Sequence, residues 1–239
     1  MLTPGDLSVD NRRYLAALRA AAARTGVTAL AGHVVSAGSR RVQAVLTASG
    51  EPVLHTLHAP HVVIAAGHAT RFLDGVPAGV RGAIRPVKGQ ILRLRHPASI
   101  PPVLTRTVRA LVQGRELYLV PRADGELVVG ATQEERDDRD VTAGAVHDLL
   151  RDAATAVPAV SELIFAEASA GLRPGTSDNG PVLGRLGRGD DGAGDLLVAA
   201  GHYRNGILLS AVTADAVTDL ISGKETHAAW APFTPERFS

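Results

Sequence analysis

The chain has 239 residues, a formal net charge of +1, 45% hydrophobic and 21% charged residues, and no cysteine. This composition is typical of a globular protein with one large domain or two small lobes. The near-neutral charge offers no field for nucleic acid or an anionic membrane, and the lack of cysteine excludes disulfides and thiolate chemistry. No signal-peptide pattern opens the sequence and no apolar run approaches the roughly 20 residues of a membrane helix, so we expect a soluble cytoplasmic protein.

The first part of the chain predicts one helix followed by four short strands. Asp10 can cap a helix that starts at residue 11, and Gly26 stands where a left-handed glycine would end it. Residues 27–67 predict the four strands, with glycine- and serine-rich turns between them. The last strand, 61–67, is apolar without alternation, which indicates a parallel or central position. The apolar face of the helix carries Tyr14, Leu15, Leu18 and Ala22.

The middle of the chain predicts four more strands and a second helix. The strands lie within 85–129, and the Asp-Gly pair at 124–125 supplies turn chemistry between the last two. The charged run 134–140 ("EERDDRD") is most simply a solvated loop. Thr142 opens a helix that ends before Pro158. The inward face of this helix is expected to carry Val146, Leu149, Leu150, Ala153 and Val157.

The last part of the chain predicts a strand, a long loop and a strand–turn–helix unit. Residues 161–174 form the strand, 174–194 the loop, and 195–201 a buried second strand. A glycine-containing turn then leads into a helix from about 206 to 221, and the tail after Thr226 is expected to be irregular. The unpaired N–H groups and the positive dipole end of such a helix favour an anion.

Two polar side chains stand out at places where their neighbours restrict the backbone. Arg173 precedes Pro174, which forces it into an extended conformation, and it closely follows Gly171, which allows close backbone approach. A guanidinium held in this way can bind a carboxylate through two parallel hydrogen bonds; the alternative is an ordinary surface arginine in a loop. Tyr118 offers a phenol on a strand with apolar neighbours, where a tyrosine is more often part of the core.

Two further patterns do not support a nucleotide or metal site. The run "GRGDDG" at 187–192 matches G-x-G-x-x-G, but it precedes a strand and its two aspartates would repel a pyrophosphate. His55, His58 and His61 recur every three residues, yet in a strand the middle one points to the opposite face, so we expect no metal site. The sequence also has no serine nucleophile turn and no phosphate-binding loop.

Five segments, in their order and spacing, resemble the glycine oxidase branch of the D-amino-acid oxidase family: "HVVIAAGHAT", "RPVKGQILRL", "LYLVPRADGELVVGAT", "AGLRPGTSDNGPVLG" and "AAGHYRNGILLSAVTADAV". The resemblance extends from Ser8 to about Ile221. It implies an α/β (α+β) fold of the two-lobe, FAD-dependent amino-acid oxidase type. It also implies FAD as cofactor and oxidation of glycine or a similarly small amino acid to its imine, then to glyoxylate and ammonia. Oxygen would accept the electrons and become hydrogen peroxide, often within thiamine thiazole synthesis.

The resemblance also assigns roles to individual residues. Arg173 is similar to the arginine that binds the substrate carboxylate, Tyr118 to the tyrosine that orients the carboxylate or amine, and Arg204 to a second substrate-contacting arginine. No catalytic acid or base is assigned, because hydride transfer to a flavin needs none if the amine arrives neutral. A helix N-terminus beyond Arg204 would stabilise negative charge on the reduced flavin. The positions that match cofactor-binding residues are Val35, Ala66, Gly67, His202, Tyr203, Arg204, Asn205, Gly206, Ile207 and Leu208.

The front of the chain departs from the family pattern. The family opens with a strand, a G-x-G-x-x-G turn, a helix and an acidic residue for the ribose, and none of these is found here. We therefore expect a fold truncated at its N-terminal dinucleotide-binding (Rossmann βαβ) unit, with an exposed sheet edge and a missing layer. A longer protein that starts upstream of Met1, a separate chain that supplies the unit, and a decayed fragment are three open explanations.

The resemblance divides the chain into four parts. Residues 1–24 form a connecting helix, 25–80 the first part of an FAD-binding lobe, 81–170 a substrate-binding lobe with a mixed sheet, and 171–239 the second part of the FAD-binding lobe with a C-terminal helix and tail. Two alternatives to an oxidase stay open at this stage: a related flavin amine dehydrogenase, and a non-catalytic fragment or partner subunit of a flavoprotein. Homo-oligomer formation is a further expectation.

Overall fold

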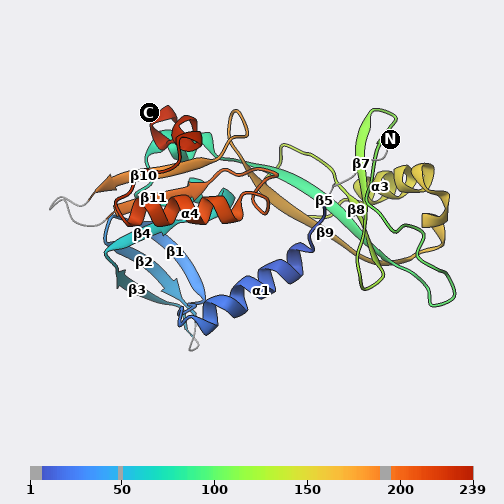
Figure 1. The fold of residues 1–239 in the computed structure, drawn as a ribbon, viewed down its shortest axis with the longest axis horizontal. Helices are drawn as coiled ribbons and strands as arrows, with labels where there is room; N and C mark the ends of the chain where they lie inside the picture. The colour runs from blue at the N-terminus through green and yellow to red at the C-terminus, as the bar shows by residue number, and fades with distance from the viewer. Residues whose placement is uncertain (1–6, 48–50, 189–194, 239) are drawn as a thin grey trace. The chain divides into compact units, whose positions relative to one another are not determined.

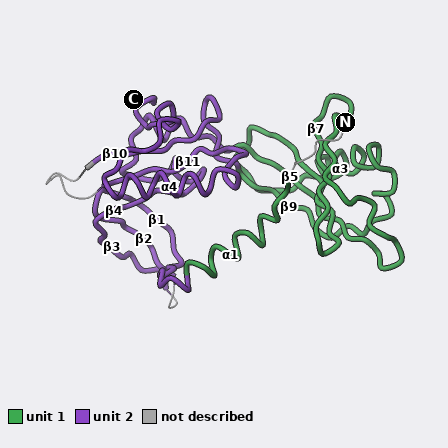
Figure 2. Tube along the Cα trace, in the orientation of Figure 1, with its two compact units in different colours: residues 1–22, 87–172 green, residues 23–86, 173–239 purple. Residues whose placement is uncertain are grey.

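The structure is a computed structural model that describes residues 7–47, 51–188 and 195–238 (Figure 1). The chain divides into two compact units, which Figure 2 distinguishes by colour. Unit 1 comprises residues 1–22 and 87–172, and unit 2 comprises residues 23–86 and 173–239. Two long strands, β5 (Arg85–Arg95) and β9 (Ile164–Gly175), contribute residues to both units.

Unit 1 is built on a five-stranded sheet in the order β6-β7-β8-β5-β9. Its hairpin strands are β6 (Val108–Val112), β7 (Arg115–Pro121) and β8 (Glu126–Gly130), which pair antiparallel, so the predicted strands are confirmed. The helix α3 (Ala143–Ala156) lies against β6, β7 and β8, and the short η2 (Pro158–Glu162) follows it.

The sequence predicted the start and the inward face of α3 correctly. The Thr142 hydroxyl accepts the N–H of Ala145, as an N-cap residue does. Leu149 and Ala153 are buried, and the other predicted side chains pack partly buried beside them. This helix and the sheet enclose the core of unit 1, which contains Leu92, Leu94, Val112, Leu117, Leu119, Leu127, Val129, Leu149, Ala153 and Val160.

Unit 2 contains a three-stranded sheet in the order β10-β11-β4. The strands are β4 (His61–Ile64), β10 (Val182–Arg188) and β11 (Asp195–Ala200); β11 runs parallel to β4 and antiparallel to β10. The predicted parallel or central position of residues 61–67 is therefore confirmed by the parallel pairing of β4 with β11. Among the described residues β4 is an edge strand, as expected if a neighbouring layer is missing.

A second three-stranded sheet of unit 2 consists of β1 (Gly32–Ala37), β2 (Arg41–Leu46) and β3 (Val53–His58). Together with β4 these strands confirm the four predicted between residues 27 and 67. Every residue of β3 is exposed, so only β1 and β2 contribute buried side chains. The short helices η1 (Gly67–Phe72) and α2 (Ala78–Ala83) complete this part of the chain.

The first helix, α1 (Asn11–Arg24), has the predicted ends. The Asp10 carboxylate accepts the N–H groups of Arg12 and Arg13 at 3.0 and 3.1 Å, and Gly26 adopts φ +82°. No residue of α1 is buried, and Leu15 and Leu18 on its apolar face are each 46% exposed. The helix therefore carries an apolar face that the described residues do not bury.

Three predictions for the last part of the chain need correction. The predicted loop 174–194 contains strand β10, whose Val182 and Leu183 are buried in register with β11. The last helix, α4 (Ser210–Ile221), begins later than predicted, because residues 206–209 form turns. The tail is not irregular: it folds into two short 3-10 helices, η3 (Ala228–Phe233) and η4 (Pro235–Phe238).

Candidate functional site

The turn after β11 contains two residues with left-handed backbone conformations. Gly201 adopts φ +73°, and a Cβ atom there would lie 2.9 Å from the Thr176 side chain. Tyr203 adopts φ +49°, a left-handed conformation that is costly for a residue with a side chain. Its N–H donates a hydrogen bond to the carbonyl oxygen of Pro174 at 2.9 Å. The conformation of Tyr203 is thus fixed by a contact with the end of β9.

This hydrogen bond joins the two segments that carry the predicted substrate arginines. Arg173 directly precedes Pro174, and Arg204 directly follows Tyr203, so their backbones are brought together within unit 2. Arg173 is half-buried, whereas Arg204 is exposed and its guanidinium lies 5.4 Å from the centre of the Tyr203 ring. A cation over an aromatic face gains a modest electrostatic attraction that restricts the arginine side chain.

His202 is held by the helix that follows the turn. Its Nε2 lies 3.0 Å from the Thr213 hydroxyl on α4, and burial lowers the pKa of His202 from its ordinary value of 6.5. Desolvation disfavours the charged imidazolium, so the ring is neutral at pH 7. His202 therefore offers a hydrogen-bonded, uncharged side chain beside the two arginine segments.

The lowered pKa of His202 gives a prediction about pH and stability. Above pH 6.5 the ring is neutral in both states, and as the pH falls below this value the unfolded chain binds more protons, so folding stability is lost. We expect His202→Gln to lose less free energy of unfolding than the wild type between about pH 7.5 and 5.5. Urea unfolding at the two pH values measures this, and equal losses in both proteins would contradict it.

The predicted cofactor residues of the first part of unit 2 line one cavity. Val35 on β1 and Ala66 after β4 both face a cavity of about 500 Å³, whose walls are β1, the end of β4 and η1. Gly67 follows directly with φ +57°. The lining is mostly apolar and includes Val34, Val35, Val62, Val63, Ile64, Ala65, Ala66, Ala69, Phe72 and Leu73.

The sheet register relates this cavity to the arginine segments. In the parallel pair of β4 and β11, Ile64 stands opposite Val198. The residues that follow, Ala66 and Gly67 on one side and Gly201 and His202 on the other, therefore leave the sheet at the same edge. The carboxyl ends of parallel strands are the usual place for a ligand in sheets of this kind.

Tyr118 lies in unit 1, where its phenol is in close contact with Gly130. It stands opposite Gly130 in the β7–β8 pair, and its phenol packs so closely on this glycine that a Cβ atom at Gly130 would overlap it. Tyr118 is half-buried. Any larger residue at position 130 would push the phenol away, and no pattern in the sequence reveals this contact.

The sequence predicted that the charged run 134–140 is a solvated loop. This prediction needs correction. Glu134 and Asp138 are half-buried and bind two buried side chains of β5, Lys88 and Gln90. The missed signal is the pair Lys88 and Gln90, two polar residues that alternate along strand β5 and therefore share one face of it. A buried lysine needs a carboxylate partner, and the acidic run supplies it.

No group of three or more histidine, aspartate or glutamate side chains in the described part of the chain is placed to hold a metal ion. His61 bonds Asp195 at 3.1 Å, while His55 and His58 lie on the exposed strand β3. Residues 189–192 of the "GRGDDG" run lie outside the described residues. No described helix is long and apolar enough to cross a membrane.

A family described as "FAD dependent oxidoreductase" matches residues 1–220 of the chain. The chain belongs to this family. It is 38% identical, over 99% of its length, to the glycine oxidase of Geobacillus kaustophilus, and 39% identical, over 98%, to the bifunctional protein ThiO/ThiG of Synechocystis sp.. The crystal structure of glycine oxidase from Geobacillus kaustophilus superimposes with a TM-score of 0.69 over 92% of this chain and 56% of that one.

These similarities confirm the resemblance and the fold class predicted from the sequence. The chain spans 59% of the Geobacillus glycine oxidase and 34% of the Synechocystis protein. The matched proteins are therefore considerably longer than this chain. The roles of the individual site residues stay predictions.

Proposed function

We propose that the chain forms the flavin- and substrate-binding part of an oxidase that acts on glycine or a similarly small amino acid. The observation that carries the proposal is the hydrogen bond from Tyr203 N–H to the Pro174 carbonyl. It brings Arg173 and Arg204 into neighbouring positions near the carboxyl edge of β4 and β11. The similarity to proteins named glycine oxidase and ThiO/ThiG supports the substrate class and a link to thiamine synthesis.

The residues present at this edge fit FAD. The cavity of about 500 Å³ offers an apolar surface with Val35 and Ala66, and residues 202–208 offer backbone groups at the same edge of the sheet, after the parallel neighbour β11. Apolar walls with a few polar groups are typical of cofactor sites. When bound, FAD supplies the acceptor for the hydride that leaves the substrate Cα. The positive end of α4, which follows residue 209, favours negative charge near the turn.

The arginines orient the substrate in this proposal. Arg173 binds the carboxylate of the amino acid through two parallel hydrogen bonds, and Arg204 contacts the same substrate from the neighbouring turn. Tyr118 of unit 1 orients the carboxylate or the amine through its phenol. Fixing the carboxylate fixes the direction of the Cα–H bond, and orientation of this kind is a large part of catalysis by proximity. None of the three residues needs to act as an acid or base.

The proposed products follow from the oxidation of an amine by two electrons. Loss of hydride and a proton converts glycine to its imine, water hydrolyses the imine to glyoxylate and ammonia, and oxygen takes up the electrons as hydrogen peroxide. A cytoplasmic location belongs to the proposal, since the chain has no cysteine that an oxidising compartment would pair.

The test is peroxide formation by the purified chain supplied with FAD. We expect the chain to retain yellow colour after removal of free FAD and to form peroxide with glycine. Glycolate, which replaces the amine by a hydroxyl, is the matched control and should give none. A coloured chain that forms no peroxide with any small amino acid, but reduces a dye acceptor, would replace the oxidase by a dehydrogenase. A chain that does neither would contradict the proposal.

A further inference from the structure

Unit 1 contains a buried network of polar side chains for which the proposed reaction has no use. Lys88 and Gln90 on β5 are 0% and 1% exposed. Four partners surround them on the segment 132–142, so six residues form what we call the polar cluster: Lys88, Gln90, Thr132, Glu134, Asp138 and Thr142. Buried polar groups are expensive unless their hydrogen bonds are made, so a network of this size needs an explanation.

Gln90 is the centre of the hydrogen bonds of the polar cluster. Its backbone N–H donates to the Thr132 hydroxyl oxygen at 2.9 Å, and its side-chain NH2 donates to Glu134 at 2.7 Å. Its side-chain oxygen accepts the backbone N–H of Thr142 at 2.8 Å. The Thr132 hydroxyl in turn donates to Glu134 at 2.6 Å. One glutamine thus fixes three places on the segment that follows β8.

Lys88 provides the buried ion pair of the polar cluster. Its ammonium group forms an ion pair with Asp138, which also accepts the Arg136 Nε–H at 2.7 Å. The hydrogen bond from Lys88, followed by that from Arg136, lowers the pKa of Asp138 to about 2, so the carboxylate is charged at every physiological pH. Lys88 and Glu134 also exchange both backbone hydrogen bonds, at 2.8 and 3.0 Å.

The polar cluster adjoins the Tyr118 contact. Strand β8 pairs with β5 up to Gly130, opposite Ile91, and beyond this point Thr132 and Glu134 continue the pairing to Gln90 and Lys88. Residues 130–132 therefore lie between two contacts: the Tyr118 phenol, which packs on Gly130, and the polar cluster. Moving this short segment requires breaking one of the two.

We propose that the polar cluster is a positioning device that holds Gly130–Thr132 against the Tyr118 phenol and so limits the size of the substrate side chain. This inference rests on the proposed function, because it assumes that Tyr118 faces the substrate. Lys88 and Gln90 are positioning residues here and touch no substrate themselves. A buried ionic network can select one conformation among competing packings, best attested where it fixes the register of neighbouring elements.

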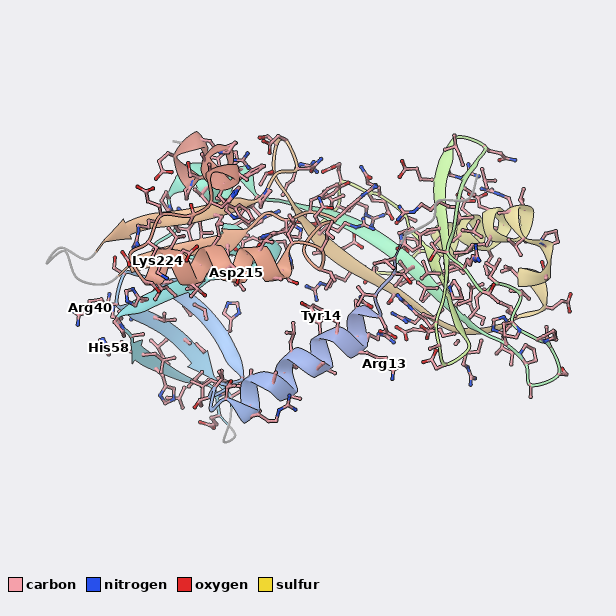
Figure 3. The ribbon with its side chains drawn as sticks, viewed as in Figure 1. Arg13, Tyr14, Arg40, His58, Asp215 and Lys224 are labelled. Atoms are coloured by element: carbon pink, nitrogen blue, oxygen red, sulfur yellow. The ribbon has the colours of Figure 1, made fainter. Side chains whose placement is uncertain are left out.

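The first test is substrate selectivity in Lys88→Met, with Lys224→Met as the matched control. Position 224 holds the other lysine of the sequence, and Lys224 is exposed after α4, where Figure 3 labels it. We expect Lys88→Met to raise kcat/KM for D-alanine relative to glycine by about tenfold, because one methyl group more or less in a pocket has effects of this order. A merely structural role would reduce the active fraction and leave this ratio unchanged, which would overturn the inference.

The second test needs no activity and so separates this inference from the proposed function. The chain has three tyrosines, at positions 14, 118 and 203, and can be labelled with 3-fluorotyrosine, with Tyr118→Phe identifying the Tyr118 resonance. We expect Lys88→Met, and independently Thr132→Val, to shift the ¹⁹F resonance of Tyr118 and leave the other two in place. Unchanged Tyr118 resonances in folded variants would overturn the positioning role. A shifted resonance in a chain without oxidase activity would retain the positioning of Tyr118 by the polar cluster and refute the proposed function, and with it the limit on the substrate side chain.

Discussion

Arg173→Ala should weaken the apparent affinity for the amino-acid substrate by roughly 2–4 kcal/mol, which corresponds to a fall of about 30- to 1,000-fold in kcat/KM. The reason is that the guanidinium is the proposed partner of a desolvated carboxylate, and truncation leaves that charge unpaired. Steady-state kinetics with glycine and FAD measure the effect. Arg173→Lys should recover only part of it, because an ammonium cannot form two parallel hydrogen bonds to one carboxylate.

A surface arginine of the same unit provides the control for this result. Arg81 lies 3.5 Å from Asp74 in an exposed ion pair, and such pairs contribute little. Arg81→Ala should therefore leave kcat/KM near the wild-type value. If Arg173→Ala and Arg81→Ala gave the same kinetics as the wild type, Arg173 would be an ordinary loop arginine and the carboxylate clamp would be wrong.

The second large effect concerns Gly75, which supports the first strand of the proposed cofactor cavity. Gly75 adopts φ +93°, and a Cβ atom there would overlap the backbone carbonyl of Ala37. The neighbouring Asp74 carbonyl accepts the Ala37 N–H at 2.9 Å, so the two backbones cannot separate without breaking this bond. We expect Gly75→Ala to lower the free energy of unfolding by about 3 kcal/mol or more, from left-handed strain plus overlap.

Gly26→Ala separates the two contributions to this effect. Gly26 has a similar φ of +82°, but nothing lies within 4 Å of a Cβ atom built on it. Gly26→Ala should therefore show only the strain, about 1 kcal/mol. Urea unfolding of both variants measures the difference. Equal stabilities would show that the close contact between Gly75 and Ala37 is not rigid.

The elements that the sequence predicted correctly are those with local signals. Asp10 and Thr142 accept the backbone N–H groups that their positions before a helix predict, and Gly26 has the left-handed conformation expected of it. The strands of unit 1 followed from short apolar runs with a turn signal at 124–125. These signals lie within a few residues of the element they define, so no knowledge of tertiary contacts was needed.

The elements that were missed depend on contacts between distant residues. Strand β10 contains Gly184 and Gly187, which suggested a loop, yet Gly184 makes room for Pro235 of the tail, and a register shift lies between Arg185 and Gly187. The sequence alone does not show that the tail returns to this strand. The end of β11 shows the opposite error, because the apolar residues after Asn205 suggested a helix where the structure has turns.

In the candidate site, too, some residues could be predicted from the sequence and others could not. The arginines and Tyr118 were chosen through the resemblance to known oxidases, and the structure adds the Tyr203–Pro174 hydrogen bond and the Gly130 contact. The polar cluster around Lys88 was missed because its partners lie about 40 to 50 residues away in the sequence. A solvated loop and a buried ionic network have the same local composition, so only the pairing of β5 with residues 132–134 distinguishes them.

The most direct test of the proposed site is the visible absorbance of the FAD-loaded chain when glycine is added without oxygen. Two-electron reduction bleaches the yellow flavin, so the spectrum reports cofactor binding and substrate oxidation together. We predict bleaching in the wild type and its absence in Arg173→Ala at the same glycine concentration. A chain that holds FAD but keeps its colour with glycine and every other small amino acid would contradict the account.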